Sequence, residues 1–228
     1  MGTRGFITFV ASDLREPTGE VEKTTYNHLD SYPEGLGVSV LEWLRDEVHP
    51  DNPTNWTRLV RAITDLRVVH GRPDEEQTPV TPQDIKRLAT YADLGVDTHD
   101  ENNQRHEQPT WYQLLRGTQG DPAKILASGY LLDAHDFPRD SLFAEWGYVV
   151  DTRRKTFEVY EGFQKKGHNA GRFAHRGRLV RRITKKGVKV MSDYYPVKEI
   201  FTWPLTELPT TEWFVTVCGE YVKSKYGE

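Results

Sequence analysis

"RGFITFVASDLREPTGEVEKTTYNHLDSYPEGLG", residues 4–37, is the stretch that decides the fold class of this chain. Its first eight residues, 4–11, are rich in aromatic and β-branched side chains and are typical of a strand. The polar stretch that follows contains Pro17 and Gly19, which favour a loop, and residues 21–27 then have the pattern of a second strand. We therefore expect the chain to begin with two paired strands.

The residues after this opening predict helices first and strands later. Apolar side chains repeat at helical spacing, or capping residues begin a helix, over 38–48, from Asn52-Pro53, from Thr81-Pro82, and over 110–117 and 121–129. Strand patterns return over 141–151 with 155–163, over 176–184 with 187–195, and over 197–205, before a last helix at 210–226. This order predicts an α+β fold with a mainly antiparallel sheet and helices packed on it. We expect one domain over 1–228, with the polar loop at 93–109 as the best candidate boundary.

The composition excludes several classes of protein. Aromatic residues make up 11% of the chain, which a disordered protein would lack, and no run of 18 apolar residues predicts a membrane span. The first ten residues lack the apolar core of a signal peptide, and the single cysteine, Cys218, cannot form an internal disulfide or a thiolate zinc site. No phosphate-binding glycine motif, GxSxG elbow or HExxH pair occurs. We expect a cytoplasmic protein with no cofactor, no metal and no membrane partner.

The polar string at 26–37 is the best candidate site. If the chain stayed extended, His28, Asp30 and Tyr32 would share one face, and a carboxylate beside a histidine can raise its basicity for general-base chemistry. The alternative is a structural turn with no binding role, in which the side chain of Asn27 or Asp30 hydrogen-bonds to the local backbone and Gly35 allows the bend. The residue pattern leaves both interpretations open.

A second candidate group lies late in the chain. Glu145 sits inside the apolar run at 141–151, where a buried carboxylate needs a partner or a raised pKa. Arg172 is a candidate partner for it, and a half-exposed strand face is the simpler alternative. The predicted ligand-binding residues are thus His28, Tyr32, Glu145 and Arg172.

The charge of the chain is unevenly distributed. Residues 165–189 carry ten Lys or Arg and no Asp or Glu, whereas the other 20 basic residues face all 34 acidic ones, a balance of −14. Such a segment predicts contact with phosphate or nucleic acid, while a solvated hairpin beside an acidic body explains it equally well. The candidate residues are Lys165, Lys166, Arg176, Arg178, Arg181, Arg182, Lys185 and Lys186.

The start of the chain, Met-Gly-Thr before a strand, suggests a third chemistry. In N-terminal-nucleophile hydrolases, the free amine of the first residue acts as base for its own side chain. Removal of the initiator Met leaves Gly2, which has no nucleophile. Thr3 would serve only after further processing, with Arg4, Asn27 and Asp30 assisting.

Several longer motifs resemble an uncharacterised family of actinobacteria and their phages: "MGTRGFITFV", "EKTTYNHLDSYPEGLG", "PTWYQLLRGTQGDPAKILASGY", "DSLFAEWGYVVDTRRKTFEVYEGFQ" and "YYPVKEIFTWPL". The resemblance extends distantly to N-terminal-nucleophile hydrolases, which implies a four-layer αββα sandwich. It implies no settled activity. We therefore expect a non-catalytic binding or accessory protein, phage-encoded and acting on a host protein or small ligand. The alternatives are an amide hydrolase or transferase acting through Thr3, and nucleic-acid binding through 165–189.

Overall fold

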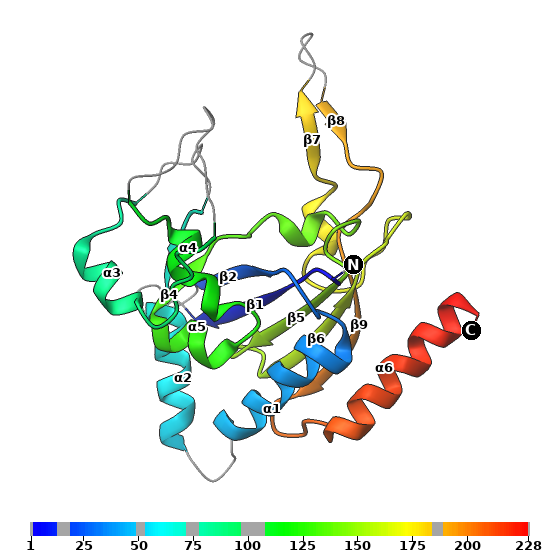
Figure 1. Ribbon diagram of the computed structural model, residues 1–228. Helices are drawn as coiled ribbons and strands as arrows, with labels where there is room; N and C mark the ends of the chain where they lie inside the picture. The colour runs from blue at the N-terminus through cyan, green and yellow to red at the C-terminus, as the bar shows by residue number, and fades with distance from the viewer. Residues whose placement is uncertain are drawn as a thin grey trace.

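The computed structural model describes residues 2–12, 19–48, 53–71, 78–96, 108–183 and 189–227 (Figure 1). Its central sheet has five strands: β1 (Gly5–Ser12), β2 (Glu20–Asn27), β5 (Trp146–Asp151), β6 (Thr156–Glu161) and β9 (Lys198–Pro204). Their order is β2-β1-β5-β6-β9, and neighbours are antiparallel except for β1 and β5, which are parallel. The predicted α+β fold with a mainly antiparallel sheet is confirmed. Among the described residues no second large sheet stacks on this one, so the αββα sandwich is unconfirmed.

Two hairpins of this sheet agree with the sequence pattern. β1 pairs with β2 from Gly5 opposite Asn27 to Ser12 opposite Glu20, and β5 pairs with β6. β5 begins later than expected, because residues 141–143 form a turn, after which the backbone N–H of Ala144 bonds the carbonyl of Asp140 at 2.9 Å. The parallel pairing of β1 with β5 joins segments far apart in the sequence, which no local pattern signals.

One face of the sheet is covered by helices α1 (Val38–Glu47), α2 (Pro53–Asp65) and α6 (Thr211–Tyr226). Because side chains alternate along a strand, Ile7 and Phe9 of β1 point into this core. Leu44 of α1 and Phe214 of α6 meet them there, and all four side chains are fully buried. Figure 1 shows α1 and α6 on the same side of the sheet.

The opposite face is partly apolar and partly ionic. Phe6 and Tyr160 pack there with Phe173 from the segment after β6. Two further positions on this face carry carboxylates, Asp151 and Glu158, whose side chains are only 1% and 3% exposed. The segment after β6 covers them with a guanidinium, described below, so this face is closed by an ion network.

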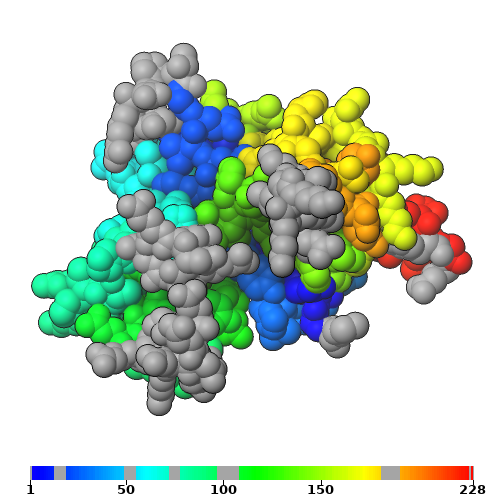
Figure 2. All heavy atoms as spheres, turned by 90° about the horizontal axis from the view of Figure 1, so that it is seen from above, coloured from blue at the N-terminus to red at the C-terminus, as the bar shows by residue number. Residues whose placement is uncertain are grey.

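Residues 67–71, 78–96 and 108–132 form a lobe beside the sheet. Its strands β3 (Arg67–Val69) and β4 (Tyr130–Leu132) are parallel. Its helices are α3 (Pro82–Leu88), α4 (Trp111–Leu115) and α5 (Pro122–Ser128), with the short turn η2 (Arg116–Thr118) after α4. The cap predicted at Thr81 begins α3, and a second reciprocal cap, at Thr110, begins α4. In Figures 1 and 2 the lobe lies at one end of the molecule and α6 at the other.

The basic segment contains a second hairpin, as predicted. β7 (Val180–Ile183) pairs antiparallel with β8 (Lys189–Met191), and Figure 1 shows both projecting away from the sheet. Lys23 of β2 ties the end of α2 to the sheet, because its Nζ donates to the carbonyls of Ile63, Thr64 and Leu66. The single-domain organisation stays a prediction, because most of the loop at 93–109 lies outside the described residues. No helix of the described residues is long and apolar enough to cross a bilayer.

Candidate functional site

The string at 26–37 leaves the sheet where β2 ends and folds back against the start of β1. The side-chain amide of Asn27 donates to the hydroxyl of Ser31 at 2.8 Å and to the carbonyl of Leu29. The backbone N–H of Ser31 bonds the carbonyl of Thr3 at 3.2 Å, and the hydroxyl of Tyr148 donates to the carbonyl of Ser31 at 2.9 Å. These bonds fix the loop on the sheet from two sides.

A tight turn, η1 (Pro33–Gly37), completes the string and leads into α1. The N–H of Leu36 bonds the carbonyl of Asp30 at 2.8 Å, which draws the backbone of Gly35 against Asp30. A Cβ atom at Gly35 would overlap that carbonyl oxygen, so this position has room only for glycine. The predicted turn therefore forms where expected, and the close approach of Gly35 to the Asp30 carbonyl explains why it needs a glycine.

The expectation that His28, Asp30 and Tyr32 share a face is wrong in this structure. Asp30 has a φ of 52°, so the chain is not extended there and the alternation of side chains stops. Nδ1 of His28 bonds the hydroxyl of Tyr26 at 2.8 Å, and the Tyr32 hydroxyl donates to Asp30 at 3.4 Å. The histidine is thus paired with a phenol, and the carboxylate belongs to the turn.

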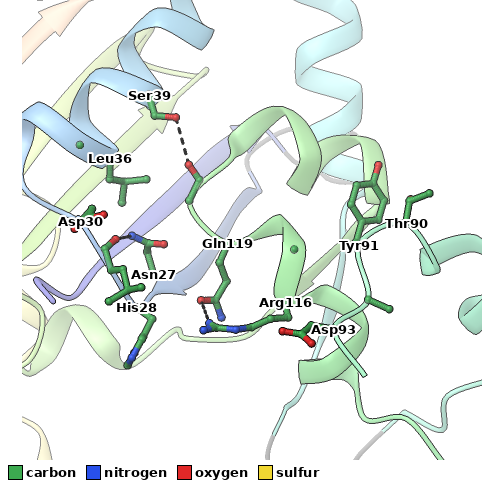
Figure 3. Close-up of a pocket in the computed structure, with 15 residues that line it drawn as sticks. Asn27, His28, Asp30, Leu36, Ser39, Thr90, Tyr91, Asp93, Arg116 and Gln119 are labelled. Carbon is green, nitrogen blue, oxygen red and sulfur yellow. Dashed lines mark hydrogen bonds between the residues drawn. The ribbon is translucent and has the colours of Figure 1, made fainter. Parts of the chain in front are cut away.

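A pocket of about 590 Å³ opens between this string and the lobe (Figure 3). One side is formed by residues 27–30 together with Gly35, Leu36 and Ser39, and the other by residues 90–93 with Arg116, Gly117, Gln119 and Gly120. We call it the junction pocket. It contains three of the predicted site residues, Asn27, His28 and Asp30, whereas Tyr32 does not line it.

Arg116 supplies the cation of the junction pocket. Its NH1 donates to Oε1 of Gln119 at 2.7 Å, and its guanidinium carbon lies 5.6 Å from the centre of the Tyr112 ring. No ion pair among the residues that the structure describes involves this guanidinium. In Figure 3 the side chains of Arg116 and Gln119 extend toward the side that holds Asn27 and His28.

The backbone around Arg116 is closely constrained. The N–H of Gly117 bonds the carbonyl of Tyr91 at 2.8 Å, and a Cβ at Gly117 would lie 2.6 Å from that oxygen. On the far side, the hydroxyl of Ser39 in α1 donates to the carbonyl of Gly120 at 3.3 Å, which links the lobe to α1. The sequence pattern does not single out Arg116. Its only local signal is its place before Gly117, which marks the end of α4.

The four residues of the nucleophile hypothesis are only partly brought together. The carbonyl of Thr3 and the amide of Asn27 both contact Ser31. Arg4 is turned toward Glu145, bonding Oε1 through its backbone N–H at 3.2 Å and through Nε at 3.5 Å. Asp30 lines the junction pocket. Catalysis through Thr3 stays a prediction.

Glu145 and Arg172 do not pair with each other, contrary to the expected partnership. Glu145 bonds Arg4, whereas Arg172 donates from Nε and NH2 to Glu158, at 3.1 and 2.8 Å, and from NH2 to Asp151. Its side chain is 7% exposed. Burial alone would lower the pKa of Arg172, but the two carboxylates outweigh it and raise that pKa further. Arg172 is therefore fully engaged in the ion network.

The basic candidates are divided between ion pairs, rings and open positions. Arg176 pairs with Glu22, and Arg178 donates to the carbonyl of Ser192 at 3.2 Å while lying 5.2 Å from the centre of the Tyr195 ring. The Lys165 ammonium lies 5.9 Å from the Tyr194 ring, and Lys166 is exposed. The other candidates are Arg181 and Arg182, which belong to β7, and Lys185 and Lys186, which lie outside the described residues. Nucleic-acid binding stays a prediction.

The pKa of Tyr26 is raised above its ordinary value of 10.0, mainly because the phenol is withdrawn from water. The charge of Arg4 acts in the opposite direction, and Arg116 does so more weakly. The phenol is therefore protonated at neutral pH and is able to donate to Nδ1 of His28.

Among the described residues, no group of three or more His, Cys, Asp or Glu side chains is arranged to hold a metal ion. The chain matches no protein-family model, and neither curated proteins nor solved structures gave a match. The resemblance to an actinobacterial and phage family therefore stays a prediction, and the geometry of the junction pocket is the main guide to function.

Proposed function

We propose that the protein is a binding protein for a small anionic ligand, which it holds in the junction pocket through Arg116. The observation that carries the proposal is a positioned guanidinium with no carboxylate partner among the described residues, at the wall of a pocket. Arg172 and Arg176 are paired with acids. Arg154 and Arg178, like Arg116, have no acid partner among the described residues; of these arginines, Arg116 lines the junction pocket. A guanidinium offers several N–H donors in a fixed plane, which suits a carboxylate or a phosphate.

The location of the pocket supports the same function. Ligand sites are often formed where two structural units meet, because such junctions leave a concave surface lined by both. Here the sheet contributes Asn27 and His28, and the lobe contributes Arg116 and Gln119. The hydrogen bond from Arg116 to Gln119 orients the cation before a ligand arrives, which lowers the entropy cost of binding.

The remaining charged groups narrow the class of ligand. Asp30 and Asp93 also line the junction pocket and are acceptors of hydrogen bonds. A purely anionic molecule would be repelled by them, whereas a ligand with hydroxyl or amino groups beside its anion would satisfy them. A sugar phosphate has this combination of groups.

Calorimetric titration with ribose 5-phosphate and with inorganic phosphate tests the proposal. Removing a charge-assisted hydrogen bond costs about 1.5–3 kcal/mol, so Arg116→Gln should weaken ribose 5-phosphate binding about tenfold or more. The matched control is Arg154→Gln, since Arg154 is exposed in the turn between β5 and β6. The proposed function would be refuted if Arg116→Gln bound ribose 5-phosphate as tightly as the unaltered protein does, or if the unaltered protein bound neither probe.

A further inference from the structure

A second cavity, of about 800 Å³, lies on the other side of Gln119, which lines both spaces. Four aromatic side chains contribute to its wall: Tyr26, Tyr112, Phe137 and Phe143. We call it the aromatic cavity. No residue predicted from the sequence as a ligand contact lines it, although Arg4 of the nucleophile hypothesis does.

The rings of this wall are held in place by neighbouring groups. The Phe137 ring meets the Tyr26 ring edge-on, with centroids 5.0 Å apart and planes at 82°. The guanidinium of Arg4 lies 4.4 Å from the centre of the Phe143 ring, and that of Arg116 lies 5.6 Å from the Tyr112 ring. Rings fixed in this way form a surface on which a flat molecule stacks without reorganising the wall.

The aromatic cavity and the junction pocket share a wall residue, Gln119. Arg116 contacts Tyr112, a wall residue of the aromatic cavity, while lining the junction pocket itself. Gln119, the hydrogen-bond partner of Arg116, belongs to both walls. The end of β2 also contributes to both walls: Tyr26 lines the aromatic cavity and Asn27 lines the junction pocket.

Polar groups of the aromatic cavity indicate what kind of ring it accepts. The carboxylates of Asp133 and Asp136 line it. Asp136 accepts a hydrogen bond from Arg139 at 2.8 Å, and Asp133 accepts one from the backbone N–H of His135 at 3.2 Å. A carboxylate accepts several hydrogen bonds, so both keep acceptor capacity for a ligand. A hydrocarbon ring would leave these acceptors without a bond from the ligand. A heteroaromatic ring with amino groups supplies donors to them while stacking on the aromatic side chains.

We propose that the aromatic cavity receives the heteroaromatic ring of the same ligand whose anion Arg116 holds, so that the ligand class is that of a mononucleotide. This inference rests on the proposed function, because it places the anion at Arg116. Beyond the proposed function, it adds a second contact region on the protein and assigns an aromatic ring to the ligand. The phosphate lies in the junction pocket, the base stacks in the aromatic cavity, and Gln119 separates the two.

The test compares three probes on the unaltered protein by calorimetric titration: adenosine 5′-monophosphate, ribose 5-phosphate and adenosine. Stacking of a base on aromatic side chains contributes about 1–3 kcal/mol per base. Adenosine 5′-monophosphate should therefore bind about tenfold or more tightly than ribose 5-phosphate. This comparison uses no variant, so it does not depend on whether a substituted chain folds.

Two variants then assign the two halves of the ligand. Phe143→Leu should weaken binding of the nucleotide about tenfold and leave the affinity for ribose 5-phosphate unchanged, whereas Arg116→Gln should weaken both. Equal affinities for the nucleotide and for ribose 5-phosphate, with Arg116 still required, would overturn the ring site and leave the proposed function intact. Adenosine binding as tightly as the nucleotide, unaffected by Arg116→Gln, would overturn both.

Discussion

Replacement of Arg172 by methionine tests whether the ion network holds the second face of the sheet. Methionine fills similar space without a charge and leaves Asp151 and Glu158 facing each other without a cation between them. Both carboxylates are almost inaccessible to water, with 1% and 3% of their side-chain surface exposed. Water therefore cannot take the place of the lost guanidinium unless the covering segment opens.

The expected loss of stability is large for a single substitution. Removing one partner of a buried ion pair typically costs about 3–5 kcal/mol, because the remaining charge stays desolvated. For a chain of this size, each kcal/mol shifts the melting temperature by about 2–4 °C, so the melting temperature should fall by about 6–20 °C. Urea unfolding followed by tryptophan fluorescence measures the free energy directly.

Arg153→Met is the matched control, since it removes the same kind of side chain from an exposed pair. Arg153 bonds Glu20 at 2.5 Å, but the two side chains are 35% and 41% exposed. Exposed pairs of this kind contribute about 0–1 kcal/mol. Adding Glu158→Gln to Arg172→Met should recover part of the loss by removing one uncompensated charge. If Arg172→Met cost no more than Arg153→Met, the assignment of Arg172 as the central cation of this face would be refuted.

Three further outcomes follow from the packing. Gly147→Ala should destabilise the protein by about 1–3 kcal/mol, because a Cβ there overlaps the Phe6 ring, whereas Gly219→Ala in α6, with open space around it, should stabilise by up to about 1 kcal/mol; thermal unfolding compares them. Burial raises the pKa of Cys218 to about 12, so iodoacetamide at about pH 8 should label the thiol only in denaturant, and rapid labelling of the native protein would contradict its buried position. Burial alone would raise the pKa of Asp84, but hydrogen bonds from Thr81 and Tyr130 lower that pKa below its ordinary value of 3.8. The ionised Asp84 therefore stabilises the fold fully above about pH 3.8, and this stabilisation is lost as the pH falls through the lower pKa of the folded protein. Asp84→Asn should flatten the loss of stability below about pH 4 in acid titrations of unfolding, and an unchanged slope would argue against this assignment.

The parts of the fold that the sequence predicted are those fixed by local patterns. β1 is rich in aromatic and β-branched side chains, and β2 follows it after a polar stretch with Pro17 and Gly19. Helices α3 and α5 begin at the caps that the sequence predicts, Thr81 and Asp121. β3 and β4 were not predicted, because three residues are too few for a period and each needs a distant parallel partner.

Only the part of the candidate site that is local in the sequence was predicted. Asn27, His28 and Asp30 do line a pocket, but the positive φ of Asp30 removed the face on which His28 was expected to meet it. Arg116 lies far from them in the sequence and is placed beside them by the packing of the lobe. The partners of Arg172 likewise depend on the segment that crosses the sheet, which strand alternation does not reveal.

The parallel pairing of β1 with β5 has a consequence for biosynthesis. β1 is buried at seven consecutive residues, Gly5–Ala11, yet its second neighbour leaves the ribosome only after the whole lobe has been made. Until then the β1–β2 hairpin has an unpaired, apolar edge, which is the kind of edge that associates with other chains. Closing this contact requires a long loop and should limit the folding rate. Nascent chains truncated before Trp146 should accordingly bind chaperones or aggregate, and chains that extend beyond Glu161 should be the first to protect the amides of β1 that face β5.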